Sequence, residues 1–136
     1  MRQTNVKRGA IRVIAGSALT GKEGYLVKLV DNSSVPSAYL PEAVTDVAAY
    51  VVIEGAAAGS LCSIQPLEHG QQVRVVANST TLVAGDKVVA YASGQEGKAT
   101  EYAGSGAAFV VGVAEETGDT AGQWVLVRPL LSYWTA

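Results

Sequence analysis

The feature that most constrains how this chain folds is an internal repeat with a spacing of 63 positions. Leu19 and Leu82 are separated by 63 positions, and Pro66 and Pro129 are separated by the same number. Two distant pairs of residues with one spacing indicate an internal duplication. The two copies cover the following ranges: residues 15–68 and residues 78–131.

Further segments match between the copies. Residues 49–52, Ala-Tyr-Val-Val, align with residues 108–111, Ala-Phe-Val-Val. Residues 61–67 align with residues 124–130, and both segments end in Pro-Leu. Each copy has a leucine, a polar turn with glycine, a run of β-forming residues and a polar loop. The alignment therefore predicts that each copy consists of strands separated by turns.

Short β-rich runs recur at intervals of about 8–15 residues with turn residues between them, which is typical of a sandwich or barrel. Residues 31–36 are expected to form a loop, and the only expected helical turn is at residues 41–50. The predicted fold is all-β with little helix, a compact barrel or sandwich built from two internally repeated β-units. The expected strands cover residues 10–15, 25–30, 50–54, 61–64, 71–77, 87–92, 108–113 and 123–128.

The chain has 136 residues, a length that suits one domain. This β domain is expected at residues 13–136, behind a basic N-terminal arm at residues 1–12. The arm carries a net charge of +4. The rest of the chain has six Lys and Arg and twelve Asp and Glu, and therefore a net charge of −6. Either the arm docks on an acidic surface, or it is a solvated terminus. The cations of the arm are Arg2, Lys7, Arg8 and Arg12.

Composition excludes several classes of protein. No run of about 18 apolar residues is present, so no membrane span is predicted, and the N-terminus lacks the apolar core of a signal peptide. The single cysteine, Cys62, cannot form an intramolecular disulfide and is expected to be a small buried residue. The acidic body also argues against nucleic-acid binding.

One short segment resembles a nucleotide-binding motif. Gly16 and the pair Gly21-Lys22 reproduce part of the phosphate-loop pattern. That pattern requires Ser or Thr after the lysine, to bind Mg²⁺, and a helix whose N-terminal amides hold the phosphates. Here Glu23 follows the lysine, and a β-rich run begins at Gly24. The segment is therefore predicted to be a turn that leads into a strand.

Residues that catalyse reactions or hold metals are few in this sequence. A nucleophile needs a neighbouring base, and the candidates for an enzyme are limited to Glu68, His69 and Cys62. No catalytic residue, metal site or cofactor is predicted. One acidic turn either binds a calcium ion weakly or is a solvated hairpin tip. Its members are Glu115, Glu116 and Asp119.

The large apolar residues suggest where the core and the contacts lie. Trp124 and Phe109 are expected to be interior, because each is the bulky member of a strand made of Val and Ala. The C-terminal segment carries apolar side chains that a free end should not expose. Either this tail packs on its own barrel, or it packs on a neighbouring subunit. Its members are Leu130, Leu131, Tyr133 and Trp134.

The segment LVAGDKVVAY, followed by GKATEY and by AFVVGVAEETGDTAGQWVLVRPL, resembles the small capsid cement, or decoration, proteins of tailed bacteriophages. The resemblance covers roughly residues 10–131 and includes the two-copy layout. It implies an all-β fold, no catalysis, and binding to the outer face of an assembled capsid, commonly as an oligomer. This family has no catalytic residues to transfer to this sequence.

The resemblance implies a non-catalytic protein of the virion that stabilises an assembled phage head from its outer surface and is made in the host cytoplasm. Its expected partners are the major capsid protein and further copies of the chain, with a trimer favoured over a dimer. Neither nucleic acid nor a membrane is expected as a partner. The alternative is a carbohydrate- or ligand-binding β-module of a virion, with Trp124 or Trp134 as a stacking platform. The basic arm and the C-terminal segment are not part of the resemblance. From their charge and apolar side chains, capsid or subunit contacts are expected at Arg2, Lys7, Arg8, Arg12, Leu130, Leu131, Tyr133 and Trp134.

Overall fold

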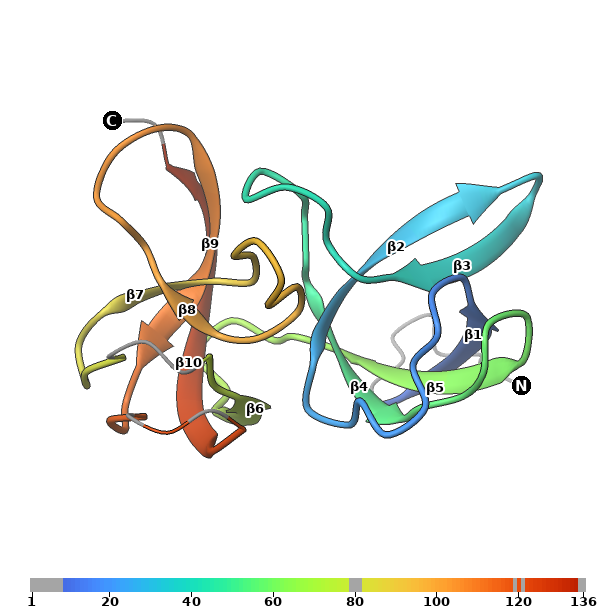
Figure 1. Ribbon diagram of the computed structural model, residues 1–136, viewed down its shortest axis with the longest axis horizontal. Helices are drawn as coiled ribbons and strands as arrows, with labels where there is room; N and C mark the ends of the chain where they lie inside the picture. Colours follow the sequence, from blue (N-terminus) through green and yellow to red (C-terminus); the bar gives the residue numbers. More distant parts are fainter. Residues whose placement is uncertain (1–8, 79–81, 119, 121, 135–136) are drawn as a thin grey trace, which may run out of the picture.

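The computed structural model describes residues 9–78, 82–118, 120 and 122–134, and these residues form ten strands and no helix (Figure 1). The predicted all-β fold is therefore confirmed. The strands are β1 Ile11–Ala15, β2 Leu26–Asn32, β3 Val35–Tyr39, β4 Tyr50–Glu54, β5 Leu61–Pro66, β6 Val73–Val76, β7 Lys87–Val89, β8 Thr100–Glu101, β9 Ala108–Ala114 and β10 Trp124–Trp134.

The helical turn expected at residues 41–50 is wrong, because the side chain of Asp46 holds this segment in turns. Its carboxylate accepts hydrogen bonds from the backbone N–H of Glu42 at 2.8 Å and of Ala43 at 3.2 Å. The same carboxylate pairs with Lys28 Nζ at 2.9 Å. An aspartate that bonds to nearby backbone competes with the hydrogen bonds of a helix. The segment is instead a loop between β3 and β4.

The first half of the chain forms a closed barrel with the strand order β1-β3-β2-β4-β5. β1 closes the barrel because it pairs antiparallel with β5 and parallel with β3. Val13 and Ala15 of β1 point into the barrel, whereas Arg12 is exposed, as strand alternation requires. The barrel core consists of Val13, Ala15, Leu19, Val27, Ala38, Val52, Cys62 and Ile64.

A hairpin replaces the loop that the sequence predicts at residues 31–36. β2 and β3 continue through this segment until Asn32 pairs with Val35. Ser33 and Ser34 form the turn, with φ angles of 52° and 69°. A two-residue hairpin turn of this kind is usually built from Asn and Gly, which tolerate positive φ. A Ser-Ser pair does not carry that signal, so the sequence pattern is typical of a loop.

The second half forms a five-stranded sheet with the order β6-β10-β9-β7-β8. The longest strand, β10, lies between β6 and β9 and is irregular between Pro129 and Ser132. The strands predicted in this half correspond to β6, β7, β9 and β10 with shifted ends. β8 is not among the expected strands, because its two residues are too few to produce a sequence pattern.

The two halves share one pattern of strand pairing. In each half, the first strand pairs with the fifth, the fifth with the fourth, the fourth with the second, and the second with the third. The hydrogen bonds also correspond, since Ala15 N–H donates to Ser60 O at 2.8 Å and Ala77 N–H donates to Gln123 O at 2.7 Å. The halves differ in closure. In the first half, β1 and β3 pair in parallel. The corresponding strands of the second half are β6 and β8, and there the only parallel pairing in the described residues is a bridge between Ala77 and Ala99, which lie just outside these strands.

The alignment of Ala-Tyr-Val-Val with Ala-Phe-Val-Val is wrong by three positions. Val52 pairs with Ile64 in the barrel, and Ala114 pairs with Val127 in the second sheet. Because Ile64 and Val127 keep the spacing of 63, Ala114 is the equivalent of Val52. Similar small and branched residues recur along β9, so composition does not specify the register, which is set by the strands that pair with it.

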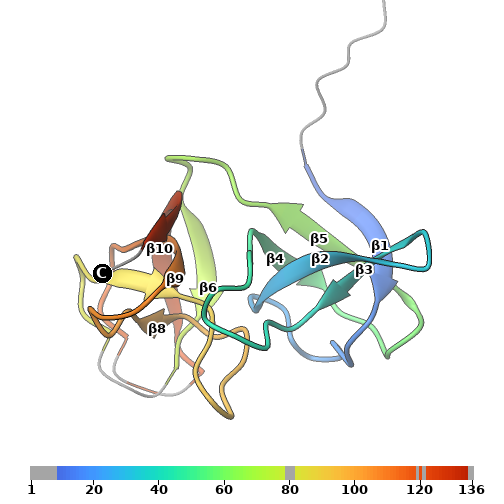
Figure 2. The ribbon, with the colours of Figure 1, turned by 90° about the horizontal axis from the view of Figure 1, so that it is seen from above.

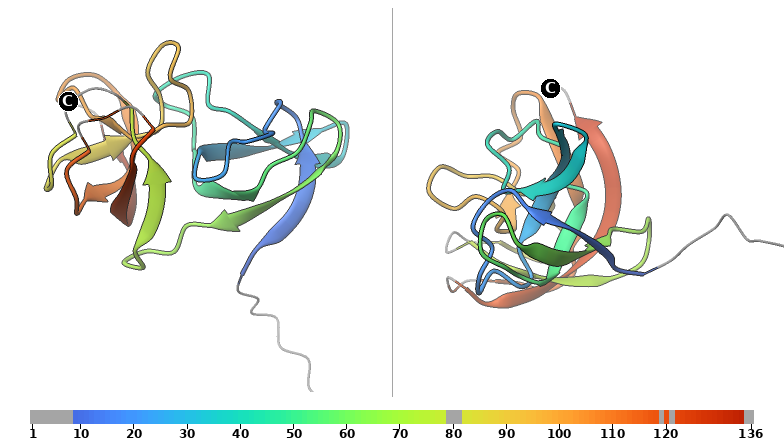
Figure 3. Two further views of the ribbon diagram at one scale, coloured as in Figure 1. Left: turned by 60° about the horizontal axis from the view of Figure 1, so that its bottom comes forward. Right: turned by 90° about the vertical axis from the view of Figure 1, so that its right-hand side faces the viewer.

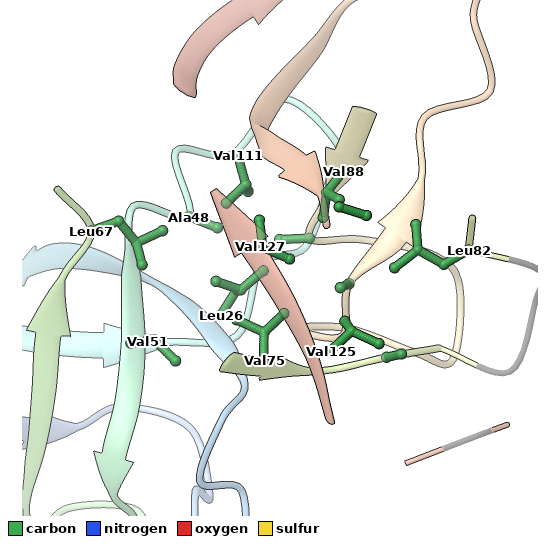
Figure 4. Packing of buried hydrophobic residues seen from close by; sticks show 14 of the residues in the cluster. Leu26, Ala48, Val51, Leu67, Val75, Leu82, Val88, Val111, Val125 and Val127 are labelled. Atoms are coloured by element: carbon green, nitrogen blue, oxygen red, sulfur yellow. The ribbon is translucent and has the colours of Figure 1, made fainter. Parts of the chain in front are cut away.

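The largest hydrophobic cluster joins the two halves (Figure 4). The first half contributes Leu26 of β2, Val51 of β4, and Ala48 and Leu67 from loops. The sheet of the second half therefore obtains part of its core from the barrel beside it. The second half contributes Val75, Ala77, Leu82, Val88, Ala90, Ala99, Phe109, Val111, Ala114, Val125 and Val127.

Backbone hydrogen bonds also connect the halves, which lie side by side along the longest axis (Figures 2 and 3). Val76 N–H donates to Gly24 O at 3.0 Å, and Leu26 N–H donates to Gly97 O at 2.7 Å. Both bonds involve the segment that leads into β2. This segment is therefore one of the parts of the first half that contact the second half.

Candidate interaction surfaces

The described residues contain no cluster of three or more His, Cys, Asp and Glu that would hold a metal ion. His69 is exposed in the loop after β5, whereas Cys62 is buried inside the barrel. Burial raises the pKa of the Cys62 thiol, although the nearby Arg12 acts in the opposite direction. A protonated, buried thiol is a poor nucleophile. In the same described ranges, no helix is long and apolar enough to cross a membrane.

The Gly-Lys segment before β2 forms turns that lead into a strand, as the sequence predicts. Lys22 Nζ lies 4.9 Å from the centroid of the Tyr25 ring. Glu23 Oε2 accepts a hydrogen bond from Gly55 N–H at 2.9 Å. Both charged side chains are thus used in the packing of the barrel. A strand offers no row of helical N–H groups to a phosphate.

The acidic turn is neutralised by arginines of β6 and β10. Arg128 Nε donates to Glu115 Oε2 at 2.9 Å, and Arg74 Nη1 lies 2.8 Å from Glu116 Oε1. The hydrogen bond from Arg128, followed by one from Gln72, lowers the pKa of Glu115. Because these carboxylates already have cationic partners, the arrangement favours a structural role over a calcium site.

The predicted contact residues are placed unequally by the structure. Arg12 belongs to β1, where it is exposed and pairs across the sheet with Ser63. Leu131 packs against the cluster shared by the halves, whereas Leu130 lies at the surface. The remaining predicted residues lie outside the described part of the chain: Arg2, Lys7, Arg8, the side chain of Trp134 and, in the acidic turn, Asp119.

The C-terminal segment is the end of β10 and not a separate tail. Tyr133 and Trp134 pair with Phe109 and Ala108 of β9. The rings of Tyr133 and Phe109 meet edge to face, with centroids 5.4 Å apart and an angle of 70°. The Tyr133 hydroxyl donates to Thr45 O at 3.3 Å. Packing on the chain's own sheet is therefore observed, while 62% of Tyr133 stays exposed and available to a partner.

Of the two aromatic residues expected in the interior, Phe109 is buried and Trp124 is not. Phe109 is 6% exposed, whereas Trp124 is 48% exposed. The prediction for Trp124 is wrong because β10 alternates: Val125 and Val127 point into the core, so Trp124 points outward. Its equivalent in the first half, Leu61, is also exposed. The Val-x-Val pattern after Trp124 is the sequence signal that identifies the outward position.

A shallow groove of about 270 Å³ lies beside β8. Val89, Tyr102 and Ala108 belong to a small apolar cluster at its floor. The loop over the groove is held by Tyr102 Oη, which donates to Gly106 O at 2.7 Å. Glu101 is the charged residue in the lining. The groove has few polar groups with which to orient a small ligand.

Comparison with known proteins finds a likeness of fold. No family model and no curated protein matches the sequence. Among solved structures, the crystal structure of the head fiber gp8.5 N base in bacteriophage phi29 matches with a TM-score of 0.70 and 17% identity. The match covers 90% of this chain and 94% of that chain. Both halves are therefore included in a fold that the two chains share.

Proposed function

We propose that this chain is a structural, non-catalytic protein of a tailed-bacteriophage virion, which binds the outer surface of the assembled head and stabilises it. The observation that carries the proposal is the likeness of the whole fold to the base of a phage head fiber. A fold alone does not specify a function, so the argument also needs surfaces that suit a partner. The arm and the end of β10 are those surfaces.

Strand β1 and the end of β10 lie toward opposite ends of the molecule's longest axis (Figure 1). In the sequence, the basic arm directly precedes and overlaps the start of β1. The cations of the arm suit an acidic capsid surface, where each exposed ion pair contributes at most about 1 kcal/mol and is screened by salt. Leu130 and Tyr133 offer apolar area, which contributes about 25 cal/mol per Å² buried. We therefore assign salt dependence to the arm and most of the affinity to the end of β10.

Co-sedimentation with heads assembled from the major capsid protein of the same genome tests this proposal. The full chain should pellet with the heads. Tyr133→Ala, which retains the backbone of β10, should weaken binding at every salt concentration. Arg12→Ala should weaken binding at low salt and reduce its salt dependence. Lys22→Ala removes one cation from the body and is the matched control, which should bind like the parent. A full chain that stays in the supernatant at low salt, with intact heads, excludes the proposal.

The exposure of Trp124 favours a second candidate, a carbohydrate-binding β-module of a virion. An indole ring that is half exposed on an outer strand face is able to stack on a sugar ring. The same sedimentation assay with an insoluble polysaccharide in place of heads separates the candidates. A carbohydrate-binding module pellets with the polysaccharide and loses this binding in Trp124→Ala, whereas a cement protein pellets with heads alone.

A further inference from the structure

The hairpin of β2 and β3 projects from the barrel and leaves one strand edge open. It reaches the end of the longest axis on the side of the first half (Figure 1). β2 pairs with β4 only at Leu26 and Val27, whereas it pairs with β3 as far as Asn32. Within the described part of the chain, residues 29–32 therefore have a neighbouring strand on one side only.

The backbone groups of Leu29 and Asp31 point toward the open side. Ala38 lies directly opposite Leu29, and Ala38 O accepts a hydrogen bond from Gly16 N–H at 2.7 Å. Ala38 therefore directs its N–H and C=O toward β1 and away from β2. In an antiparallel pair, the residue directly opposite such a position also directs its groups away from its partner. Leu29, and Asp31 two positions later, thus each present an N–H and a C=O at the edge.

The other edge of the same hairpin is protected. β1 pairs with β3 at Ser37 and Ala38, and Pro36 comes directly before them in β3. Proline has no N–H, so this position offers no donor to an approaching strand. Asp31 lies directly opposite Pro36 and retains the donor that proline lacks. Of the two edges of the hairpin, the edge of β2 is therefore the one that can accept a further strand.

The side chains at the open edge match an extended polypeptide segment of a particular kind. Val30 is 37% exposed at the middle of the edge. Asp31 is also exposed, and among the described residues its carboxylate is in no ion pair. Directly opposed side chains on neighbouring strands stabilise a sheet when they are both apolar or oppositely charged. A segment with an apolar residue and a Lys or Arg would therefore match this edge.

The short length of the edge indicates how it is used. Four residues from each of two copies bury far less than the area of about 1,200 Å² that a stable interface requires. A short edge is sufficient when other contacts already hold the partner, because the local concentration of the partner is then high. The surfaces assigned above to head binding supply such contacts.

We propose that an extended segment of the head protein adds to residues 29–32 as a further strand, with an apolar residue beside Val30 and a Lys or Arg beside Asp31. In such a contact the backbone hydrogen bonds supply affinity and the neighbouring side chains supply specificity. The added strand also fixes the orientation of the chain on the head. The inference rests on the proposed binding to heads and names the segment of the chain that orients it.

Co-sedimentation with heads tests the edge through a change to one backbone donor. Asp31→Pro removes the outward N–H and leaves the hydrogen bonds between β2 and β3 in place, so it should fold and bind heads about tenfold more weakly or worse. Asp31→Asn retains that N–H and loses only the charge, so its binding should lie between those of the parent and Asp31→Pro. Thermal melts show whether each variant is folded.

Two exposed valines of the hairpin provide a matched pair of side-chain variants. Val30 lies on the open edge, whereas Val35, which is 45% exposed, lies on β3. Val30→Glu should weaken binding to heads, and Val35→Glu should bind like the parent. This pair decides the question even if Asp31→Pro does not fold, and equal binding by the two variants would contradict the proposal.

Residue-resolved hydrogen exchange gives a readout that a general loss of stability does not reproduce. The amides of Leu29 and Asp31 should exchange quickly in the free chain and slowly on heads. The amide of Val30, which faces β3, should exchange slowly in both states. Fast exchange at Leu29 and Asp31 on heads would show that no strand is added.

The outcomes separate this inference from the proposed function. If the parent and Asp31→Pro pellet equally with heads, the edge is not the contact, although binding to heads stands. A parent that stays in the supernatant excludes the proposed function and this inference with it. Self-association of the free chain below about 1 mM that Asp31→Pro abolishes would identify a second copy as the occupant and overturn the proposal.

Discussion

The barrel of the first half and the sheet of the second half have the same order of strands, yet the barrel closes and the sheet does not. In the barrel, β3 has five residues and pairs with both β1 and β2. In the second half the equivalent strand, β8, has two residues, and the loop before it turns toward the barrel, where Gly97 O accepts Leu26 N–H. On this side of β6 the second half therefore keeps only the bridge between Ala77 and Ala99, and Gly24 O of the first half accepts Val76 N–H beside it.

The largest expected effect comes from separating the halves. A fragment of residues 71–136 should not fold alone, because its inner face loses Leu26, Val51 and Leu67. A fragment of residues 1–70 should fold, because its barrel has its own buried core. The dispersion of amide signals in the NMR spectrum of each fragment shows whether that fragment is folded. Mixing the two fragments should restore the signals of the folded second half. A second fragment that folds by itself would show that the two halves are equally independent.

Gly24 and Gly85 are equivalent, because their N–H groups donate to the equivalent acceptors Val52 O, at 2.9 Å, and Ala114 O, at 2.7 Å. They provide a sharper comparison. Both have positive φ, so an alanine at either position costs about 1–2 kcal/mol. At Gly24 the new methyl group also meets the Trp124 ring, which must move, and overpacking adds about 1–3 kcal/mol. Urea unfolding should therefore show a larger loss for Gly24→Ala than for Gly85→Ala. Adding Trp124→Ala should reduce the excess, although Val76 Cγ2 would still lie 3.0 Å from the new Cβ. Equal losses of stability at the two glycines would contradict a close contact between the Gly24 turn and Trp124.

The equivalent outward residues, Trp124 and Leu61, should differ by a smaller amount. A fully buried tryptophan loses about 3–5 kcal/mol on truncation to alanine. Trp124 is half exposed but packs on the Gly24 turn, so Trp124→Ala should cost about 1–2 kcal/mol at the usual value per buried area. Leu61→Ala, with no cover, should cost less than about 1 kcal/mol. Chemical unfolding of both variants at low protein concentration keeps self-association out of the comparison.

The smallest expected effect concerns the pH dependence of stability and the loop between β3 and β4, which contacts the second half. This loop contains Asp46, and its Val44 O accepts Phe109 N–H at 2.9 Å. Partial burial opposes ionisation of Asp46, but hydrogen bonds from Lys28 and from backbone N–H groups outweigh it and lower the pKa of Asp46 from its ordinary value of 3.8. A lowered folded-state pKa stabilises the protein above the unfolded-state pKa, and this contribution is lost as pH falls through the folded-state value.

Acid titration of stability measures this contribution. The urea midpoint of the parent should fall as pH is lowered below about 4, and Asp46→Asn should reduce that slope. The pKa of Glu115 is lowered in the same direction by Arg128 and Gln72, so part of the slope should remain in Asp46→Asn. If the urea midpoint depends on pH equally in the parent and in Asp46→Asn, the ionised Asp46 does not stabilise this loop.

Much of the fold could be predicted from residue patterns, and the failures have specific physical causes. The hairpin turn at Ser33 and Ser34 depends on two positive φ angles that serine seldom adopts, so the pattern indicates a loop. The size of Trp124 predicts an interior position, although the alternation of its neighbours points it outward. The contact between the Gly24 turn and Trp124 has no sequence signal of its own, because the two segments are far apart in the chain.

The sequence by itself determined that this chain is all-β, where most strands lie, and which residues at a spacing of 63 correspond between the halves. These properties follow from β-branched runs and turn residues, which act on the backbone over a few positions. Only the tertiary structure decided that the first half closes, that the second half borrows Leu26 and Val51 for its core, and that Leu61 is left exposed. The physical reason is that each of these outcomes depends on contacts between residues far apart in the chain, and equivalent residues meet different neighbours in the two halves.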